Sequence, residues 1–344
     1  MKKYKIYNIL KIFLLVIFAF YCLTESNSIK ISVSDALNRC LTIIIPSLYA
    51  MMIVSGIISR SGLASRFGIP FIFVFSNFAG YPVGIKILCD EYSKNNISKK
   101  DAEIFSGICY GAGSAFVFGC VSGQLYGNSS TGNLILLSGL LANTLSAVTV
   151  LIFYKKSGEK EIPKRNVTLN FGMISESVAI AGKNITDICF AVLAFAVTES
   201  FLKGTGIFYT LSNIFGISPD ILSSVLDITA VNRLPVNDYT LLPFLSALVS
   251  FGGLCVIFQL TAITSGKISL IPILLIRLFT SLASFIICRL LMPFFISGES
   301  IAVSAVKIYK SPSPVPSVLL IIMTVSVFCE YEKLKGRSDK PSSE

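Results

Sequence analysis

The sequence contains neither histidine nor tryptophan among its 344 residues. Without histidine the chain cannot form Ser-His or Cys-His nucleophilic pairs, and it cannot bind zinc or haem through imidazole. Nine cysteines are present, but none form a C-x-x-C pair, and most lie inside apolar runs, where a thiol behaves as a small hydrophobic group. We therefore expect no enzyme activity, no cofactor and no metal site.

Charged residues are also scarce, at 14% of the chain compared with roughly 25% in soluble domains. Apolar residues make up 53%, and the mean hydropathy is +0.75. This composition excludes a soluble globular domain, a disordered chain and a disulfide-stapled secreted domain. It is typical of a polytopic membrane protein, with room for roughly eight to ten spanning segments of about 20 residues each.

The net charge of +10 is expected to lie mainly in cytoplasmic loops, where positive residues of membrane proteins collect. No aromatic-basic patch accompanies it, so we expect no nucleic-acid partner. Beyond an N-terminal run, the apolar segments form two series with the same order. The first comprises 41–58, a broken segment 67–89, 104–126 and 134–154; the second comprises 185–202, a broken segment 207–234, 241–263 and 268–295.

The basic loops determine the expected topology. If every apolar run crossed from a cytoplasmic N-terminus, the basic loop 155–165 would lie outside, contrary to the positive-inside rule. If each broken segment enters and leaves on one side, all strongly basic loops and both termini are cytoplasmic. Spans 41–58 and 185–202 then run in opposite directions. We therefore expect an all-α polytopic membrane protein with two inverted-topology repeats, each holding one re-entrant or broken helical segment.

This topology divides the chain into five parts. Residues 1–40 are expected to form an N-terminal membrane helix and an outer loop. The two repeats are expected at 41–154 and 185–295, joined by a cytoplasmic linker, 155–184. Residues 296–344 are expected to contain an outer loop, a last membrane helix and a basic cytoplasmic tail. Inverted repeats with Gly/Pro-interrupted segments at corresponding positions are typical of secondary transporters.

Three motifs resemble one known family. Residues 76–86 (SNFAGYPVGIK) resemble the S-G-Y-P-x-G-x-K stretch of YlbJ-type sporulation integral membrane proteins, members of the nucleoside-recognition (Gate) domain family. Residues 226–229 (LDIT) resemble that family's L-E-[IV]-T-x-G, with an Asp in place of Glu. Residues 250–259 (SFGGLCVIFQ) resemble its G-F-G-G-x-S-V-x-x-Q, and Arg277 lies where the family often has arginine. The order and spacing match over about 41–291.

The resemblance implies a multipass protein in the cell membrane of an endospore-forming bacterium, needed for proper spore formation. The name of the family implies kinship with nucleoside transporters. The first half departs from the family, because a stretch resembling S-N-P-x-F-I-x-G is replaced by residues 112–119, AGSAFVFG. The chain is therefore similar to a divergent member.

The candidate site consists of polar and glycine positions in the broken segments and the motifs. Non-helical backbone within a bilayer leaves N–H and C=O groups unpaired unless protein or a wet cavity satisfies them. Such positions can meet a polar solute at the midplane, although small residues also serve close helix packing. The candidates are Asn77, Gly80, Tyr81, Gly113, Ser114, Asp227, Thr229, Gly253 and Gln259.

Acidic residues in apolar surroundings are functional hypotheses by default, because a charge at bilayer depth costs about 2.5 kcal/mol or more. Asp227 either takes a proton or binds a solute group, beside Asn77 or Ser114 of the other repeat, or it pairs with Arg233 as a structural clamp. If it serves function, Asp227→Asn should abolish sporulation activity at normal protein level.

Two more charged residues have open interpretations. Glu199 can pair with Lys203, four residues later on the same helix. Arg277 lies deep in its apolar run. It can extend its guanidinium to the membrane surface, pair with Asp227 or meet an anionic ligand.

The sequence therefore predicts a protein that binds or transports a small polar solute, nucleoside-like or other, at a midplane site between the repeats. Its expected partners are the lipid bilayer and the solute; a coupling ion and a homo-oligomer remain open. The alternative is a non-transporting membrane scaffold for spore envelope or coat assembly. A polar cavity between the two broken segments favours the first function, and a packed, dry contact favours the second.

The basic loops give a direct test of topology. In a cysteine-free background, single cysteines introduced as Lys99→Cys and Lys160→Cys should both be protected from a membrane-impermeant thiol reagent applied to intact cells, because both loops are expected to be cytoplasmic. Permeabilised cells provide the control for reactivity. Labelling of either cysteine from outside would contradict the re-entrant assignment.

Overall fold

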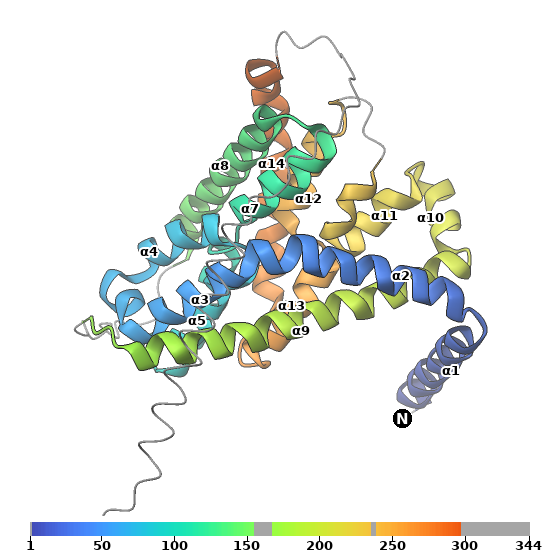
Figure 1. Ribbon diagram of the computed structural model, residues 1–344, viewed down its shortest axis with the longest axis horizontal. Helices are drawn as coiled ribbons and strands as arrows, with labels where there is room; N and C mark the ends of the chain where they lie inside the picture. Colours follow the sequence, from blue (N-terminus) through green and yellow to red (C-terminus); the bar gives the residue numbers. More distant parts are fainter. Residues whose placement is uncertain (1, 155–166, 235–238, 297–344) are drawn as a thin grey trace, which may run out of the picture. The chain divides into compact units, whose positions relative to one another are not determined.

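The computed structural model describes residues 2–154, 167–234 and 239–296, and within these ranges the regular elements are all helices, without a strand (Figure 1). This confirms the all-α expectation. The basic loop 155–165 and the expected last helix and tail within 296–344 fall almost entirely outside the described residues.

The first part of the chain forms eight α-helices and two π-helical segments. They are α1 (Lys2–Thr24), α2 (Ser26–Arg39), η1 (Cys40–Ile44), α3 (Ile45–Ser61), α4 (Leu63–Ala79), α5 (Tyr81–Ser93), α6 (Lys99–Ile108), α7 (Ser114–Phe116), η2 (Val117–Tyr126) and α8 (Ser129–Phe153). The second part, as far as it is described, forms α9 (Phe171–Gly204), α10 (Ile207–Phe215), α11 (Pro219–Leu226), the 3-10 helix η3 (Ile228–Arg233), α12 (Leu242–Phe251), α13 (Gly253–Thr264) and α14 (Ile271–Ile296).

Five helical stretches among the described residues are long and apolar enough to cross a membrane, as in a multi-pass membrane protein. They are Ser26–Ser61, Ser129–Phe153, Phe171–Gly204, Leu242–Thr264 and Ile271–Ile296.

Helices α8 and α14 pack side by side (Figure 1). Between them Ser146 and Thr280 share a hydrogen bond of 2.6 Å, and both are buried. In contrast, Leu145 and Leu282 are 47% and 67% exposed. A helix in water would present the opposite arrangement, so these outer faces suit contact with lipid.

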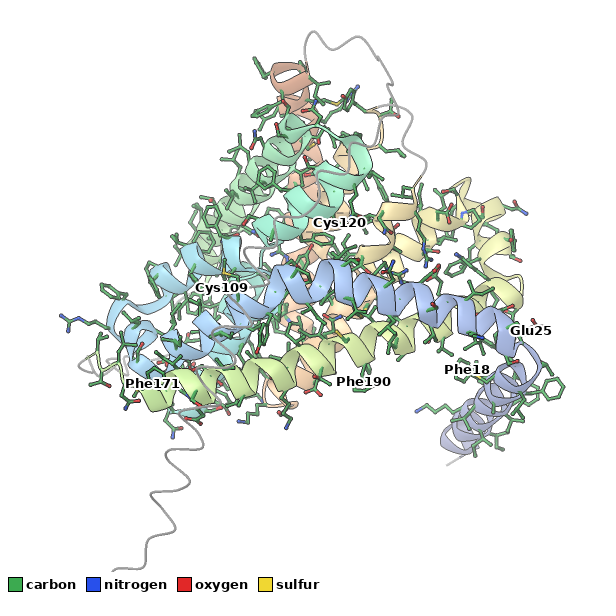
Figure 2. All side chains as sticks on the ribbon, viewed as in Figure 1. Phe18, Glu25, Cys109, Cys120, Phe171 and Phe190 are labelled. Atoms are coloured by element: carbon green, nitrogen blue, oxygen red, sulfur yellow. The ribbon has the colours of Figure 1, made fainter. Side chains whose placement is uncertain are left out.

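The kinked helix α2–η1–α3 lies alongside α9, and the two run antiparallel (Figure 1). Arg60, near the end of α3, contacts Glu176 near the start of α9. At the other end, Asp35 of α2 and Glu199 of α9 both bind Arg233. On the exposed side of α9, Phe190 points away from the neighbouring helices (Figure 2).

Two expected loops are helical in the structure. The sequence predicts an outer loop before residue 41, but residues 26–39 form α2 and continue into α3. It also predicts a linker over 155–184, but residues 171–184 are the first turns of α9. There Ser177, Ala181 and Ile185 recur every four residues and are buried, because they form one face of the helix. Small polar residues in 26–39 and 171–184 interrupt the apolar pattern, so the helical spacing is not evident from hydropathy.

The first broken segment is a helical hairpin. Helix α4 ends at Gly80, whose backbone has φ 115° and ψ 160°, and α5 starts at the next residue. The beginning of α4 and the end of α5 meet, since the Ser65 hydroxyl donates to the Glu91 carboxylate at 2.6 Å. The segment therefore enters and returns at the same end, as a re-entrant segment does.

The second broken segment consists of three short helices, α10, α11 and η3. Gly216, in a left-handed conformation, separates the first two, and Asp227 separates α11 from η3. Arg233 at the end of η3 returns to Glu199, one turn before the end of α9. This segment also begins and ends near one end of α9.

Two runs that the sequence predicts as continuous spans are interrupted. Run 104–126 breaks between α6 and α7 at residues 109–113, and run 241–263 breaks between α12 and α13. At the second break Gly252 and Gly253 have φ values of 92° and 80°, which glycine adopts without the steric cost that other residues meet. Apolar neighbours on both sides conceal these breaks in the hydropathy pattern.

Candidate functional site

The breaks of α4–α5 and α6–α7 lie against each other through glycine. A methyl group on Gly113 would lie 3.3 Å from the Cα atom of Gly80, and one on Gly111 would lie 2.7 Å from the Cα atom of Asn77. The close packing interpretation of these glycines therefore holds. It brings Asn77, Gly80 and Gly113 of the predicted site together.

Two tyrosines join these breaks to the end of α12. The Tyr81 hydroxyl donates to the carbonyl oxygen of Val249 at 2.6 Å, and the Tyr110 hydroxyl donates to that of Phe251 at 2.9 Å. Their ring centroids lie 5.0 Å apart. The last carbonyls of α12 have no partner in the next helical turn, so the tyrosines cap this helix end. Gly252 has no side chain to block Tyr110, whose hydroxyl oxygen would lie 2.1 Å from a methyl group at this position.

Arg277 of α14 is completely buried and holds the loop between α6 and α7. Its Nη1 donates to the carbonyl oxygen of Tyr110 at 2.6 Å, and its Nη2 donates to Asn143 Oδ1 at 2.8 Å. The guanidinium also lies 4.8 Å from the centroid of the Tyr110 ring. Of the three interpretations of Arg277, extension to the surface and pairing with Asp227 are therefore wrong.

Asn143 of α8 extends this network to the first broken segment. Its Nδ2 donates to Asn77 Oδ1 and, at 3.2 Å, to the carbonyl oxygen of Tyr110. We call Asn77, Tyr110, Asn143 and Arg277 the arginine network. Sequence reasoning did not select Asn143 or Tyr110, although one amide inside the long apolar run of α8 was an available signal.

A small cavity adjoins the arginine network. Its volume is about 20 Å³, which holds roughly one water molecule. Its wall includes Asn77, Tyr110, Gly111, Ala112, Asn143 and Ser250. No residue of the second broken segment lines this cavity. This cavity therefore lies beside the first broken segment and not between the two segments, where the sequence predicts it.

Asp227 belongs to a second buried polar cluster. Arg39 Nη2 donates to Asp227 Oδ2 at 3.3 Å, and Arg39 Nε donates to Thr229 Oγ1 at 3.1 Å. The Thr229 hydroxyl and backbone N–H both donate to the Asp227 carboxylate, at 2.6 and 3.0 Å. We call Arg39, Asp227 and Thr229 the aspartate cluster. All three side chains are buried.

This arrangement corrects the expected partners of Asp227. Arg233 does not pair with it but binds Glu199 at 3.0 Å, and Glu199 also binds Lys203 at 2.7 Å, as its sequence spacing suggests. Asp227 makes no hydrogen bond to Asn77 or Ser114 within the described structure, since Arg39 and Thr229 occupy its carboxylate. Arg39 was missed because it lies 188 residues away in a stretch expected to be a loop.

The break between α12 and α13 contacts both polar groups. Gly252 lies against Tyr110, while a methyl group on Gly253 would lie 3.1 Å from the backbone nitrogen of Ile228, next to Asp227. Of the remaining candidates, Gln259 Nε2 contacts Cys255 Sγ at 3.3 Å, and Ser114 is half-buried at the start of α7. In Figure 2, Cys109 marks the start of the α6–α7 break, and Cys120 lies beyond the break in η2.

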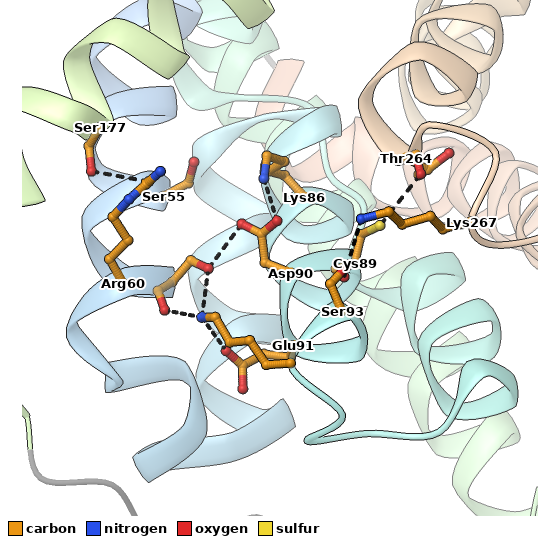
Figure 3. Close-up of polar contacts among 12 residues, drawn as sticks. Ser55, Arg60, Lys86, Cys89, Asp90, Glu91, Ser93, Ser177, Thr264 and Lys267 are labelled. Carbon is orange, nitrogen blue, oxygen red and sulfur yellow. Dashed lines mark hydrogen bonds and ion pairs between the residues drawn. The ribbon is translucent and has the colours of Figure 1, made fainter.

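Ionic contacts lie near both ends of the α3–α9 pair, although those of α5 at one end do not include α9. At one end Asp90 binds Lys86 and the Ser59 hydroxyl, and Glu91 binds Lys94 at 3.1 Å (Figure 3). We call these residues the Glu91 network. At the other end lies the Glu199 network, which consists of Asp35, Glu199, Lys203 and Arg233.

The separation of these two networks resembles the thickness of a membrane. Asp35 belongs to the Glu199 network, and Arg60 lies near the Glu91 network on the same kinked helix. The 25 residues from Asp35 to Arg60 extend about 37 Å at the rise of an α-helix. The hydrocarbon core of a bilayer is about 30 Å thick.

Comparisons with known proteins do not assign the chain to a group. No family model, no curated protein and no solved structure matches this sequence or fold.

The pairing of Arg39 with Asp227 predicts a compensating double variant. Asp227→Asn alone should destabilise the protein by about 3–5 kcal/mol, because it leaves a buried guanidinium without its counter-charge. The double variant Arg39→Gln/Asp227→Asn should regain most of this loss. Thermal unfolding of the purified protein in detergent measures it, with Asp187→Asn, an exposed acid of α9, as control. Additive losses in the double variant would contradict a direct pair.

Proposed function

We propose that this protein binds and moves a small polar solute across the membrane at the breaks of its interrupted helices. The supporting observation is that three interruptions, at Gly80, at residues 109–113 and at Gly252–Gly253, meet in one buried polar region. Broken helices of this kind expose backbone dipoles at bilayer depth, and many secondary transporters bind their substrates there.

The order of the elements supports two inverted repeats. After α1 and α2, the chain contains a long helix (α3), a hairpin (α4–α5), an interrupted helix (α6–η2) and a long helix (α8). From α9 the same order recurs as α9, α10–η3, α12–α13 and α14. Inverted repeats require corresponding helices to run antiparallel, and the contacts of α3 and α9 described above are consistent with this direction.

Helices α8 and α14 have the same antiparallel relation. Ser146 contacts Thr280, whereas Ser138, two turns earlier on α8, contacts Cys288, two turns later on α14. With the positive-inside rule, this arrangement supports cytoplasmic termini and a cytoplasmic Glu91 network. The Glu199 network then faces outward.

The two ionic networks suit the gates of an alternating-access cycle. Both networks are ion-paired in this structure, one along α5 and the other between α9 and η3. A carrier opens one gate at a time, so that the central site meets only one side. The cavity of about 20 Å³ would be the occluded form of a site that widens when a gate opens.

The cellular setting follows from the motifs around Gly80, Asp227 and Gly252. Their similarity to YlbJ-type proteins supports a role in spore formation in the cell membrane of an endospore-forming bacterium. A scaffold for spore envelope or coat assembly is the second candidate. The tight packing of Gly111 against Asn77, with a cavity of roughly one water molecule, is the observation that favours it.

Accessibility of the cavity separates the two candidates without knowledge of the solute. A single cysteine is introduced as Ala112→Cys, in the cavity wall, in a cysteine-free background. Glu91→Gln should then speed labelling by a membrane-impermeant thiol reagent from the cytoplasmic side, and Glu199→Gln from the outer side. We expect about a tenfold increase, the population shift that roughly 1.4 kcal/mol produces.

The control is Asp187→Asn, which removes an exposed charge from α9 without breaking an ion pair and should leave labelling unchanged. Inside-out and right-side-out vesicles distinguish the two sides. A labelling rate that neither gate variant changes would contradict the carrier and leave the scaffold as the better account.

A further inference from the structure

Arg277 is a buried cation without an acidic partner. Its side chain is 1% exposed, and no carboxylate of the described residues forms an ion pair with it. Arg39, the other buried arginine, has Asp227. Removing one partner of a buried pair is strongly destabilising, so a lone guanidinium at bilayer depth needs other compensation.

The acceptors around Arg277 are already in use. The carbonyl oxygen of Tyr110 accepts from Arg277 and Asn143, and Asn143 Oδ1 accepts from Arg277. Arginine only donates, so Asn143 must turn its oxygen toward Arg277 and its amide nitrogen toward Asn77 Oδ1. The carbonyl of Val249 at the end of α12 accepts from Tyr81.

Several donors beside the cavity have no acceptor. The backbone N–H groups of Gly111 and Ala112 donate to no other group in the described part of the chain, and both residues line the cavity. Arg277, which does not itself line the cavity, also has a buried Nε without a hydrogen-bond partner among the described residues. Ser250 also lines the cavity, and its hydroxyl forms no hydrogen bond with the described residues.

We infer that this cavity binds one compact, singly charged anionic group. The N–H groups of Gly111 and Ala112 and the hydroxyl of Ser250 would donate to it. Tyr110 and Asn143 form part of the cavity wall, and Arg277 contacts both of them. The positive charge of Arg277 would therefore act on the anion through this wall. Backbone N–H groups beside a fixed cation form the type of concavity that binds anions. A volume of about 20 Å³ fits a halide or the end of a carboxylate.

The inference rests on the proposed function in one respect, because it names the chemical class of the solute at that site. The ligand is defined as a group with a single negative charge and about the size of a water molecule. A free halide and the carboxylate of an organic solute are its two sources. Anion binding needs no transport, so each claim can fail while the other stands.

The test uses the purified full-length protein in detergent. Sodium methanesulfonate is replaced stepwise by sodium chloride or sodium formate at constant ionic strength, and the midpoint of thermal unfolding is recorded. Ligands that bind only the folded state raise this midpoint in a saturable way. A rise with chloride alone identifies a halide, and a rise with formate identifies a carboxylate group; either supports the inference.

Three variants locate the effect. Arg277→Gln should abolish the rise, and Ser250→Ala, which removes a hydroxyl without a protein partner, should weaken apparent anion affinity about tenfold. Ser281→Ala is the matched control, because its hydroxyl donates to the carbonyl of Ala247 outside the cavity wall. If Arg277→Gln does not fold, Ser250→Ala alone decides.

Two outcomes would overturn the inference. One is a wild-type midpoint that neither anion changes, which means that water occupies the cavity. The other is an equal rise in wild type and Ser250→Ala, which places the anion elsewhere. The labelling of Ala112→Cys with the gate variants tests the carrier independently of both results.

Discussion

Each interruption of a helix inside the apolar part of this chain leaves backbone N–H and C=O groups that need partners, and lipid supplies none. The structure meets this constraint by bringing the interruptions together. The carbonyls at the end of α12 accept from Tyr81 and Tyr110, and the carbonyl of Tyr110 accepts from Arg277 and Asn143. These donors come from α5, the α6–α7 loop, α8 and α14. The hydrogen bonds that satisfy the backbone groups at the breaks therefore also fix how these elements pack.

The same constraint explains the different surroundings of the two buried arginines. Arg39 meets a carboxylate, so the aspartate cluster is electrically balanced and can hold α2 against the second broken segment. Among the described residues Arg277 meets carbonyl and amide oxygens and the Tyr110 ring but no carboxylate, so the arginine network keeps a positive charge. The two clusters lie on either side of the Gly252–Gly253 break, which contacts Tyr110 on one side and Ile228 on the other. A negatively charged ligand would complete only the arginine network.

Composition and local pattern were sufficient for the helical class, for the five long apolar stretches and for the break at Gly80, because each depends on short stretches of sequence. The breaks at 109–113 and 252–253 were not predicted, since their glycines stand among apolar residues that preserve the hydropathy. Contacts between residues far apart in the sequence could also not be predicted from local patterns. Arg233 is close to Asp227 in sequence, yet Asp227 pairs with Arg39. The stretch that contains Arg39 is the helix α2, which packs along α9, and not the loop that was expected. Glu199 and Lys203, one helical turn apart, could be paired from spacing alone.

The central claim is that the loop between α6 and α7 is a hydrated polar break inside the membrane. Amide hydrogen exchange of the protein in lipid nanodiscs tests it most directly. In methanesulfonate buffer without chloride or formate, the N–H groups of Gly111 and Ala112, which have no acceptor among the described residues, should exchange within seconds to minutes. Residues 134–150 of α8, hydrogen-bonded in apolar surroundings, should stay protected for hours. Exchange at 111–112 as slow as in α8 would show a dry, packed contact and would contradict the account.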